Sequence, residues 1–159
     1  MKVDVQKLGK IADLTSESLI VGVFATDANL KQKAIGQVDK LVGGSVFRFL
    51  AKNKSFGKSF DSAVFHVSPR EHKLLERVVL VGMGKVGDLD SYKLRQIYGF
   101  IGKNHCKGVK SVAIAFPQNL DSEQICSLLA VGISGGLFDP GHHKTEKNGS
   151  GETKLEKVT

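Results

Sequence analysis

The segment RVVLVGMGKVG, residues 77–87, changes from a strand pattern to a helix pattern and decides the fold class. Residues 78–81 form a short run of β-branched and aliphatic side chains, which is typical of a strand buried on both faces. Beyond the glycines, apolar residues recur at helical spacing: Leu94, Ile97, Tyr98 and Ile101. The sequence therefore predicts a buried strand, a tight glycine turn, and a helix that begins near Asp88 or Asp90.

Strand and helix patterns alternate along most of the chain. Three further apolar runs predict strands at residues 19–24, 63–67 and 112–116. Helical spacing predicts a helix that follows Asp27 and ends at Gly43, a short helix capped by Ser45, and a last helix capped by Asp121. This alternation predicts an α/β protein with a largely parallel or mixed sheet.

The composition is that of an ordinary globular domain. The 159 residues are 41% hydrophobic and 25% charged, enough for one core without a disulfide or metal. Cys106 and Cys126 are interpreted as core or boundary thiols in a reducing compartment. Apolar runs fall far short of the ~18 residues of a membrane span, and the N-terminus lacks a signal-peptide pattern. We expect a cytoplasmic chain with no membrane partner, whose net charge of +7 permits an anionic partner.

The pattern changes near residue 139. Prolines, glycines and polar residues without apolar periodicity follow, and this composition is typical of a linker. Residues 154–158 then resume a strand-like alternation. We predict a domain over residues 1–138, followed over residues 139–159 by a linker and the start of a further domain, so that this last strand lacks its partners.

Residues 82–87 match the G-x-G-x-x-G pattern of dinucleotide-binding loops, between a strand and a helix. Such a site also needs an acidic residue about 20 residues on, at the end of the next strand. That strand ends at Phe116 and Pro117 without a carboxylate. Asp88 and Asp90 would also place negative charge beside the phosphates. We interpret the glycines as a tight turn from strand to helix.

Residues 132–136 match the G-x-S-x-G pattern that surrounds the nucleophilic serine of many hydrolases. In those enzymes the serine lies on a sharp turn from strand to helix, whereas Ser134 lies near the end of a predicted helix. The acid and histidine partners that follow, Asp139, His142 and His143, fall in the predicted linker. We therefore interpret the small residues as allowing close helix packing and a helix stop.

Aromatic and basic residues alternate over residues 47–60, a pattern that can serve nucleic-acid phosphates and bases. The phenylalanines are Phe47, Phe49, Phe56 and Phe60, and the basic residues are Arg48, Lys52, Lys54 and Lys58. Arginine, the dominant residue in phosphate recognition, is scarce in this chain. We interpret the phenylalanines as core anchors and the basic side chains as solvated.

His66 is interpreted as a structural residue, and no spacing of histidines and cysteines matches a metal site. The sequence thus assigns no catalytic, cofactor-binding or metal-binding residue.

Several segments, in order along nearly the whole chain, together resemble the N-terminal domain of the cytosol (leucyl) aminopeptidase family. They are residues 20–24, 43–44, 77–85, 110–117, 136–139 and 144–145. The resemblance implies a macro-domain-like α/β fold, a three-layer mixed sheet flanked by helices. It also implies a linker to a larger C-terminal domain that binds two divalent metals, zinc or manganese, and removes N-terminal residues from peptides.

The resemblance implies that this chain is the non-catalytic part of such an enzyme. Its partners would be its own C-terminal catalytic domain and further copies of the protein in a hexamer, with a role in assembly and active-site access. The resemblance also implies a DNA contact, because some bacterial relatives bind DNA. The alternative is a stand-alone macro-like module that binds ADP-ribose or nucleic acid, for which residues 27–29 and 43–45 are the candidate segments.

Overall fold

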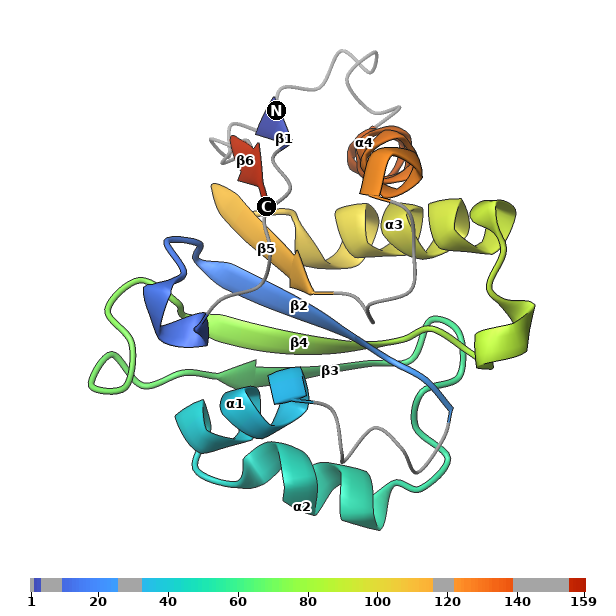
Figure 1. Ribbon diagram of the computed structural model, residues 1–159. Helices are drawn as coiled ribbons and strands as arrows, with labels where there is room; N and C mark the ends of the chain where they lie inside the picture. The colour runs from blue at the N-terminus through green and yellow to red at the C-terminus, as the bar shows by residue number, and fades with distance from the viewer. Residues whose placement is uncertain (1, 4–9, 26–32, 116–121, 139–154) are drawn as a thin grey trace, which may run out of the picture.

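The computed structural model describes residues 2–3, 10–25, 33–115, 122–138 and 155–159 (Figure 1). The strands are β1 (Lys2–Val3), β2 (Ser18–Val23), β3 (Ser62–His66), β4 (Arg77–Gly82), β5 (Ser111–Ala115) and β6 (Lys157–Val158). The α-helices are α1 (Lys33–Leu41), α2 (Ser45–Lys52), α3 (Ser91–His105) and α4 (Ser122–Leu137), and two short 3₁₀ helices are η1 (Ile11–Asp13) and η3 (Val86–Asp88). The predicted α/β class is confirmed.

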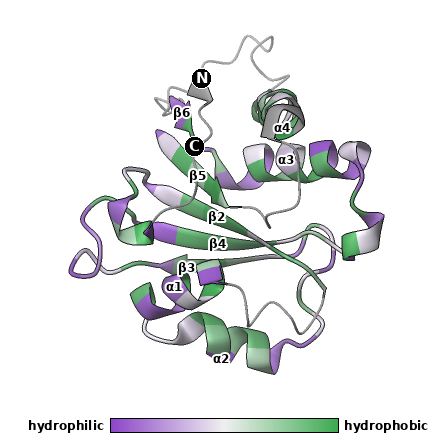
Figure 2. Ribbon diagram, viewed as in Figure 1, coloured by the Kyte–Doolittle hydropathy of each residue, from purple (hydrophilic) through white to green (hydrophobic). Residues whose placement is uncertain are grey.

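The six strands form one mixed sheet in the order β1-β6-β5-β2-β4-β3. All neighbouring strands are parallel except β3, which pairs antiparallel with β4. At the centre, Ile20 of β2 lies opposite Val79 on one side and Ile114 on the other. Hydrophobic residues run along β2 and β4, as Figure 2 shows. Strands covered on both faces need such continuous apolar runs. These two strands could therefore be predicted from the sequence alone.

Helices cover both faces of the sheet and give it three layers (Figure 1). Side chains alternate between the two faces of a strand. In β2, Ile20 accordingly packs with residues of α3 and α4, whereas Leu19 and Val21 pack with residues of α1 and α2. The predicted three-layer mixed sheet flanked by helices is therefore confirmed. No helix in the described part of the chain combines the length and apolar character needed to cross a membrane.

The strand near the end of the chain belongs to this same sheet. Lys157 and Val158 pair with Ser111 and Val112 of β5 on one side and with β1 on the other. The backbone N–H of Thr159 also donates to the carbonyl of Val112, at 2.8 Å. The expectation that this strand lacks partners was therefore wrong. Alternation predicts that a segment is a strand, but it does not say which strand lies beside it.

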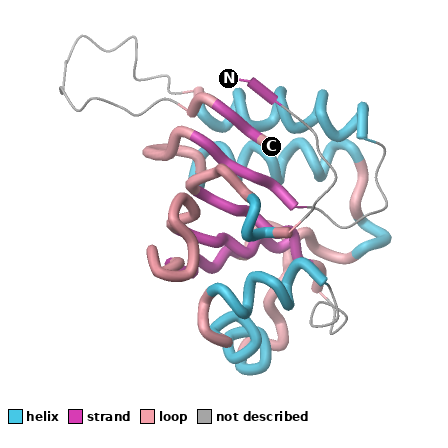
Figure 3. Tube along the Cα trace, turned by 60° about the vertical axis from the view of Figure 1, so that its left-hand side comes forward, coloured by secondary structure: helices cyan, strands magenta, loops and turns pink. Residues whose placement is uncertain are grey.

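The two ends of the described chain consequently lie side by side (Figure 3). β1 comes from the start of the sequence and β6 from its end, and they are neighbours at one edge of the sheet. The sheet is thus completed by residues that are almost as far apart in sequence as the chain allows.

Helix beginnings follow the prediction in part. Helix α3 begins after Asp90, whose carboxylate accepts a hydrogen bond from the N–H of Lys93 at 2.7 Å, which confirms one of the two predicted starts. Helix α2 is preceded by Gly44 rather than capped by Ser45. Gly44 has a φ of 77°, which a residue with a side chain rarely adopts. The other predicted caps, Asp27 and Asp121, lie outside the described residues.

Candidate functional site

The glycines of residues 82–87 form a tight turn against a second loop. A side chain at Gly82 would collide with the backbone of Lys58. The N–H of Gly82 donates to the carbonyl of Asp61 at 2.8 Å, and that of Gly84 donates to the carbonyl of Gly57, also at 2.8 Å. A phosphate-binding loop needs free N–H groups, and these two are already bonded within the protein. The interpretation as a strand-to-helix turn is confirmed, with η3 inserted before α3.

The glycines of residues 132–136 lie inside α4 and bring it close to α3. A Cβ added at Gly132 would lie 2.5 Å from the Cβ of Tyr98. A Cβ added at Gly136 would collide with the carbonyl of Gly99. Ser134 is exposed on a regular helix and not on a strand-to-helix turn. Close helix packing is therefore the role of Gly132 and Gly136, as predicted. Nothing lies within 4 Å of a Cβ added at Gly135, and α4 continues through these glycines to Leu137, so they do not stop the helix.

The aromatic stretch forms a cluster that anchors α2 and the loop after it. The ring of Phe49 lies 5.0 Å from that of Phe56 and 5.6 Å from that of Phe65, both edge-to-face. Phe60 contacts Phe100 of α3 at 5.7 Å but remains 40% exposed. Phe47 is 37% exposed, so the predicted core role holds for part of the set only. The three lysines of the stretch are exposed, as expected.

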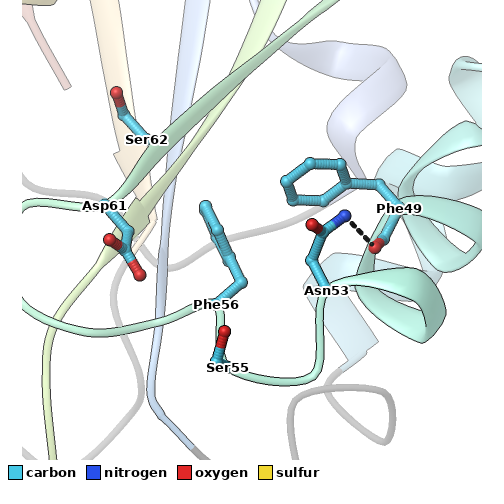
Figure 4. A pocket seen from close by; sticks show the side chains of 6 residues that line it. All are labelled: Phe49, Asn53, Ser55, Phe56, Asp61 and Ser62. Atoms are coloured by element: carbon cyan, nitrogen blue, oxygen red, sulfur yellow. Dashed lines mark hydrogen bonds between the residues drawn. The ribbon is translucent and has the colours of Figure 1, made fainter.

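Beside this cluster lies an open depression of about 260 Å³ (Figure 4). It is lined by Phe49, Asn53, Ser55, Phe56, Asp61 and Ser62. Small-molecule sites usually enclose ~300–1,000 Å³ and are mostly apolar, so this depression does not match one. Its polar groups also serve the local backbone. Asn53 donates to the carbonyl of Phe49 at 2.8 Å, and Asp61 accepts from the N–H of Lys58 at 3.0 Å.

Residues 43–44, which belong to one of the two segments suggested for ADP-ribose or nucleic acid, form the turn that follows α1. The N–H of Gly44 donates to the carbonyl of Asp39 at 2.9 Å. The guanidinium of Arg48 donates to the carbonyls of both glycines, at 3.1 and 3.3 Å. The carboxylate of Asp39 accepts from the N–H of Phe47 at 2.9 Å and replaces the missing cap of α2. These groups hold the turn together. The other suggested segment, residues 27–29, lies outside the described residues.

The cysteine and histidine side chains form no metal centre in the described part of the chain, where no group of three or more His, Cys, Asp and Glu could hold an ion. Cys106 is buried, and its burial raises the pKa of the thiol to about 12, against a lowering by Arg77, so the thiol is not nucleophilic near neutral pH. Cys126 is half-buried, so both interpretations as core or boundary thiols hold.

His66 is exposed on β3, contrary to the structural role expected of it, while His142 and His143 lie outside the described residues.

A polar cluster that the sequence analysis missed joins the amino ends of β2, β4 and β5. The guanidinium of Arg77 donates to the carbonyl of His105 at 2.8 Å and to the hydroxyl of Ser18 at 3.3 Å. The carboxylate of Glu17 accepts from the N–H of Lys110 at 2.9 Å. Burial, and secondarily Arg77, lowers the pKa of His105. These groups come from positions up to 93 residues apart, so no local motif could reveal them, and their contacts tie strand ends together.

Comparison with known proteins agrees with this architecture. The model of the N-terminal domain of the cytosol aminopeptidase family matches residues 20–147. A probable cytosol aminopeptidase from Rippkaea orientalis is 28% identical over 148 residues, which cover 92% of this chain and 29% of that protein.

Two solved structures share the fold. A mutant of tomato leucine aminopeptidase aligns with a TM-score of 0.75 and 18% identity, over 99% of this chain and 32% of that one. The bottromycin maturation enzyme BotP, in complex with Mn, aligns with a TM-score of 0.55 and 11% identity, over 90% of this chain and 26% of that one. The chain therefore spans less than a third of the length of these proteins.

Proposed function

The chain belongs to the cytosol aminopeptidase family, as its N-terminal domain, and on that premise we propose that it is the non-catalytic domain of a cytoplasmic, metal-dependent leucyl aminopeptidase. The observation that carries the proposal is the match to the N-terminal-domain model over residues 20–147. The short coverage of the longer relatives supports the same division of labour, because more than two thirds of each lies outside the matched part.

In this proposal the peptide-cleaving site lies in a C-terminal catalytic domain. That domain would hold two divalent metals, zinc or manganese, which act as Lewis acids and activate water for attack on the peptide bond. One structural neighbour, BotP, is a complex with Mn, which supports manganese as one of the two candidates. The boundary would follow residue 138, with a linker over residues 139–154 and a return to this domain's sheet at β6.

The role proposed for this domain is to support assembly and to control access to the active site. A rigid α/β body with apolar cores on both sheet faces can hold a fixed position beside an active-site entrance. The hexamer would form through the C-terminal domains. The isolated chain should then sediment as a monomer of 17.2 kDa. A hexamer formed by this chain alone would contradict that assignment.

A direct activity test decides whether this chain is catalytic. The purified chain is incubated with leucine p-nitroanilide and with Zn²⁺ or Mn²⁺, and tomato leucine aminopeptidase serves as positive control. We expect no release of nitroaniline above the metal-only blank. Release that copurifies with the chain and stops on addition of a chelator would overturn the proposal.

Titration calorimetry tests the other class of function. ADP-ribose and a short DNA duplex are added separately to the chain at low salt. We expect no heat of binding from ADP-ribose, because the N–H groups of the glycine turns are bonded within the protein. A DNA signal that weakens steeply with added salt would indicate phosphate contacts and would assign the DNA role to this domain.

A further inference from the structure

Strand β3 is the last strand at one edge of the sheet, and its outer side is open. In the described part of the chain it pairs with β4 alone, over five consecutive positions. The pairing is bounded by two hydrogen bonds. The carbonyl of Asp61 accepts from the N–H of Gly82 at 2.8 Å, and the N–H of Val67 donates to the carbonyl of Glu76 at 2.9 Å.

These two bonds determine which backbone groups of β3 face outward. In an antiparallel pair, residues that bond to the partner strand alternate with residues that do not. Asp61 and Val67 bond to β4, and so do the odd-numbered residues between them. The N–H and carbonyl groups of Ser62, Val64 and His66 therefore point away from the sheet. Within the described ranges these groups have no hydrogen-bond partner.

The two edges of the sheet are protected differently. Proteins normally protect an open edge with lysines, prolines, bulges or very short strands. The opposite edge is formed by β1, which is two residues long and contains Lys2. Strand β3 has five residues in regular register, and its sequence contains no proline and no Lys, Arg, Asp or Glu. An unprotected edge of this kind can accept a further strand.

One face of β3 is uncovered as well. Phe65 points to the side of α1 and α2, where Phe49 packs against it. Val64 lies on the face that α3 and α4 cover elsewhere in the sheet, yet it is 45% exposed. Ser62 and His66 share that face and are also exposed. The layer formed by α3 and α4 therefore does not extend over β3, and it leaves room for an added strand.

The depression described above adjoins the beginning of this edge. Its lining combines the rings of Phe49 and Phe56 with Asp61 and Ser62, where β3 begins (Figure 4). Its volume of about 260 Å³ is small for a ligand site, but an engineered cavity of ~150 Å³ already holds a benzene ring. The depression can therefore receive one aromatic or large aliphatic side chain.

The residues around the depression carry positive charge. Lys52, Lys54 and Lys58 flank its lining in the sequence and are exposed, and the chain has a net charge of +7. The lining also contains Asp61, but its carboxylate accepts from the N–H groups of Gly57 and Lys58, at 3.1 and 3.0 Å. An acidic partner is therefore attracted to this end of the edge.

We propose that the open edge of β3 and the adjoining depression bind an extended acidic segment of another polypeptide as an added strand, with one apolar side chain of that segment in the depression. Backbone pairing at a strand edge supplies affinity, and pockets for alternate side chains supply specificity. The lysines favour acidic residues beside the apolar one. This binding role goes beyond the proposed function, because it needs neither metals nor a catalytic domain.

A second copy of the chain and a nucleic acid fit these features less well. A stable interface between folded proteins takes about 20–30 residues on each side, whereas β3 provides five. Two copies would also bring together the same net charge of +7. A nucleic acid would meet the lysines, but it has no alternating N–H and carbonyl groups to pair with a strand edge.

Fluorescence anisotropy with labelled heptapeptides tests the proposal. The probe has the sequence EVEFEVE, which alternates acidic and apolar side chains as a half-buried strand does. One control is KVKFKVK, with the charge reversed. The other is EVEFEVE with an N-methyl group on every backbone nitrogen, which cannot donate to a strand edge. We expect saturable binding of the probe at low salt, and binding of both controls weaker by at least about tenfold.

Matched variants of the protein locate the site. Val64→Pro removes the central outward N–H and leaves the ladder to β4 intact, as proline at an edge position permits. A double variant, Lys54→Glu with Lys58→Glu, reverses the charge beside the depression. Its control, Lys40→Glu with Lys107→Glu, makes the same change at exposed positions elsewhere. We expect the first two proteins to bind the probe at least about tenfold more weakly and the control to keep its affinity. Thermal unfolding confirms that each variant is folded.

Other results overturn the proposal in different ways. Equal binding of the N-methylated peptide, or an unchanged affinity of Val64→Pro, shows attraction by charge without strand pairing. Equal binding of KVKFKVK removes the preference for acidic segments. A dimer in sedimentation that dissociates in Val64→Pro assigns the edge to a second copy. Single-stranded DNA that binds more tightly than the probe assigns the lysines to nucleic acid. Absence of probe binding at about 1 mM removes the site altogether.

Discussion

The two helical layers cover the same sheet from opposite sides but are built differently. Helices α1 and α2 are joined by a glycine turn and a carboxylate, and each places its own aliphatic side chains on the sheet. Helices α3 and α4 meet through glycines, with backbone against backbone. The first layer exposes charged side chains to solvent, whereas the exposed residues of α4 from Ser127 to its end are uncharged.

This difference shows that the helices on one sheet can be fixed in place by different contacts. Long side chains can pack on one side and carry charge on the other, as in α1 and α2. In the second layer, the glycines of α4 let it approach the backbone of α3 closely, while Leu129 and Ile133 of α4 pack in the shared core. The predictions below test whether the two layers contribute to stability through these separate means.

The largest effects are expected in the two cores. Ile97 lies in the core below α3 and Ile35 in the core below α1, and both are fully buried. Truncation of either to alanine leaves a cavity and should lower the free energy of unfolding by about 2–5 kcal/mol. Urea denaturation measures the effect. A loss below about 1 kcal/mol for one residue alone would show that its layer is not part of the cooperative core.

A smaller loss is expected at the glycine contact between α3 and α4. Gly136→Ala would press a methyl group against the carbonyl of Gly99 and to within 2.8 Å of the N–H of Lys103. Overpacking costs about 1–3 kcal/mol, partly offset by the better helix propensity of alanine. Gly135→Ala is the matched control, because nothing lies within 4 Å of its added Cβ. That control should be neutral or stabilising by up to about 1 kcal/mol. Equal melting temperatures for the two variants would contradict the close contact.

In the other layer, the connection between α1 and α2 depends on Asp39. Its carboxylate accepts from the N–H of Phe47 and caps α2 from a distance. Asp39→Ala should destabilise the protein by about 0.5–2 kcal/mol, as for loss of an ordinary helix cap. Asp39→Asn keeps an oxygen acceptor and should recover most of the loss. If both substitutions are neutral in urea denaturation, the joint is held by the glycine turn alone.

The polar cluster at the strand ends makes stability depend on pH. Burial lowers the pKa of His105 below its usual 6.5, with a further contribution from Arg77. The unfolded chain therefore binds a proton more readily, so the free energy of unfolding falls as the pH drops below about 6.5. His105→Gln should show a smaller change of urea midpoint between about pH 7.5 and 5.5. An identical pH dependence in both proteins would assign it to other groups.

The smallest effect is expected on the exposed side of α4. Val131 is 54% exposed and supports no buried contact that a lysine would break. Val131→Lys should change the stability of this chain by no more than about 0.5 kcal/mol. A loss of about 2 kcal/mol or more in thermal unfolding would show that the residue is already covered in this chain.

Most of the fold could be predicted from the sequence, and the reason is visible in particular residues. Val78 to Val81 form a continuous apolar run typical of a buried strand, and the four inward residues of α3 repeat at helical spacing, so each element could be identified without its neighbours. The glycines at 82–87, Gly132 and Gly136 were also interpreted correctly, because residues 82–87 lack the downstream carboxylate of a dinucleotide site and Ser134 lies within a helix instead of on a strand-to-helix turn. The family resemblance was confirmed by the match over residues 20–147.

The candidate sites were less accessible to such reasoning. The cluster around Arg77 joins β4 to Ser18 of β2 and to His105 at the end of α3, and the cap of α2 comes from Asp39 on the preceding helix. Neither has a fixed spacing that a motif could express. The exposure of Phe47 and Phe60 was likewise missed, because an aromatic residue at a suitable spacing can lie at the rim of a core as well as inside it.

By itself, the sequence determined the α/β class, the alternation of elements, the role of the glycines and the family, because these depend on local periodicity and on residue type. Only the tertiary structure decided that β6 joins this sheet between β1 and β5, that Arg77 ties strand ends together, and that one side of α4 is left uncovered. Each of these depends on contacts between segments far apart in the chain. Periodicity says which face of an element is apolar, whereas the partner of that face is set by the packing of the whole domain.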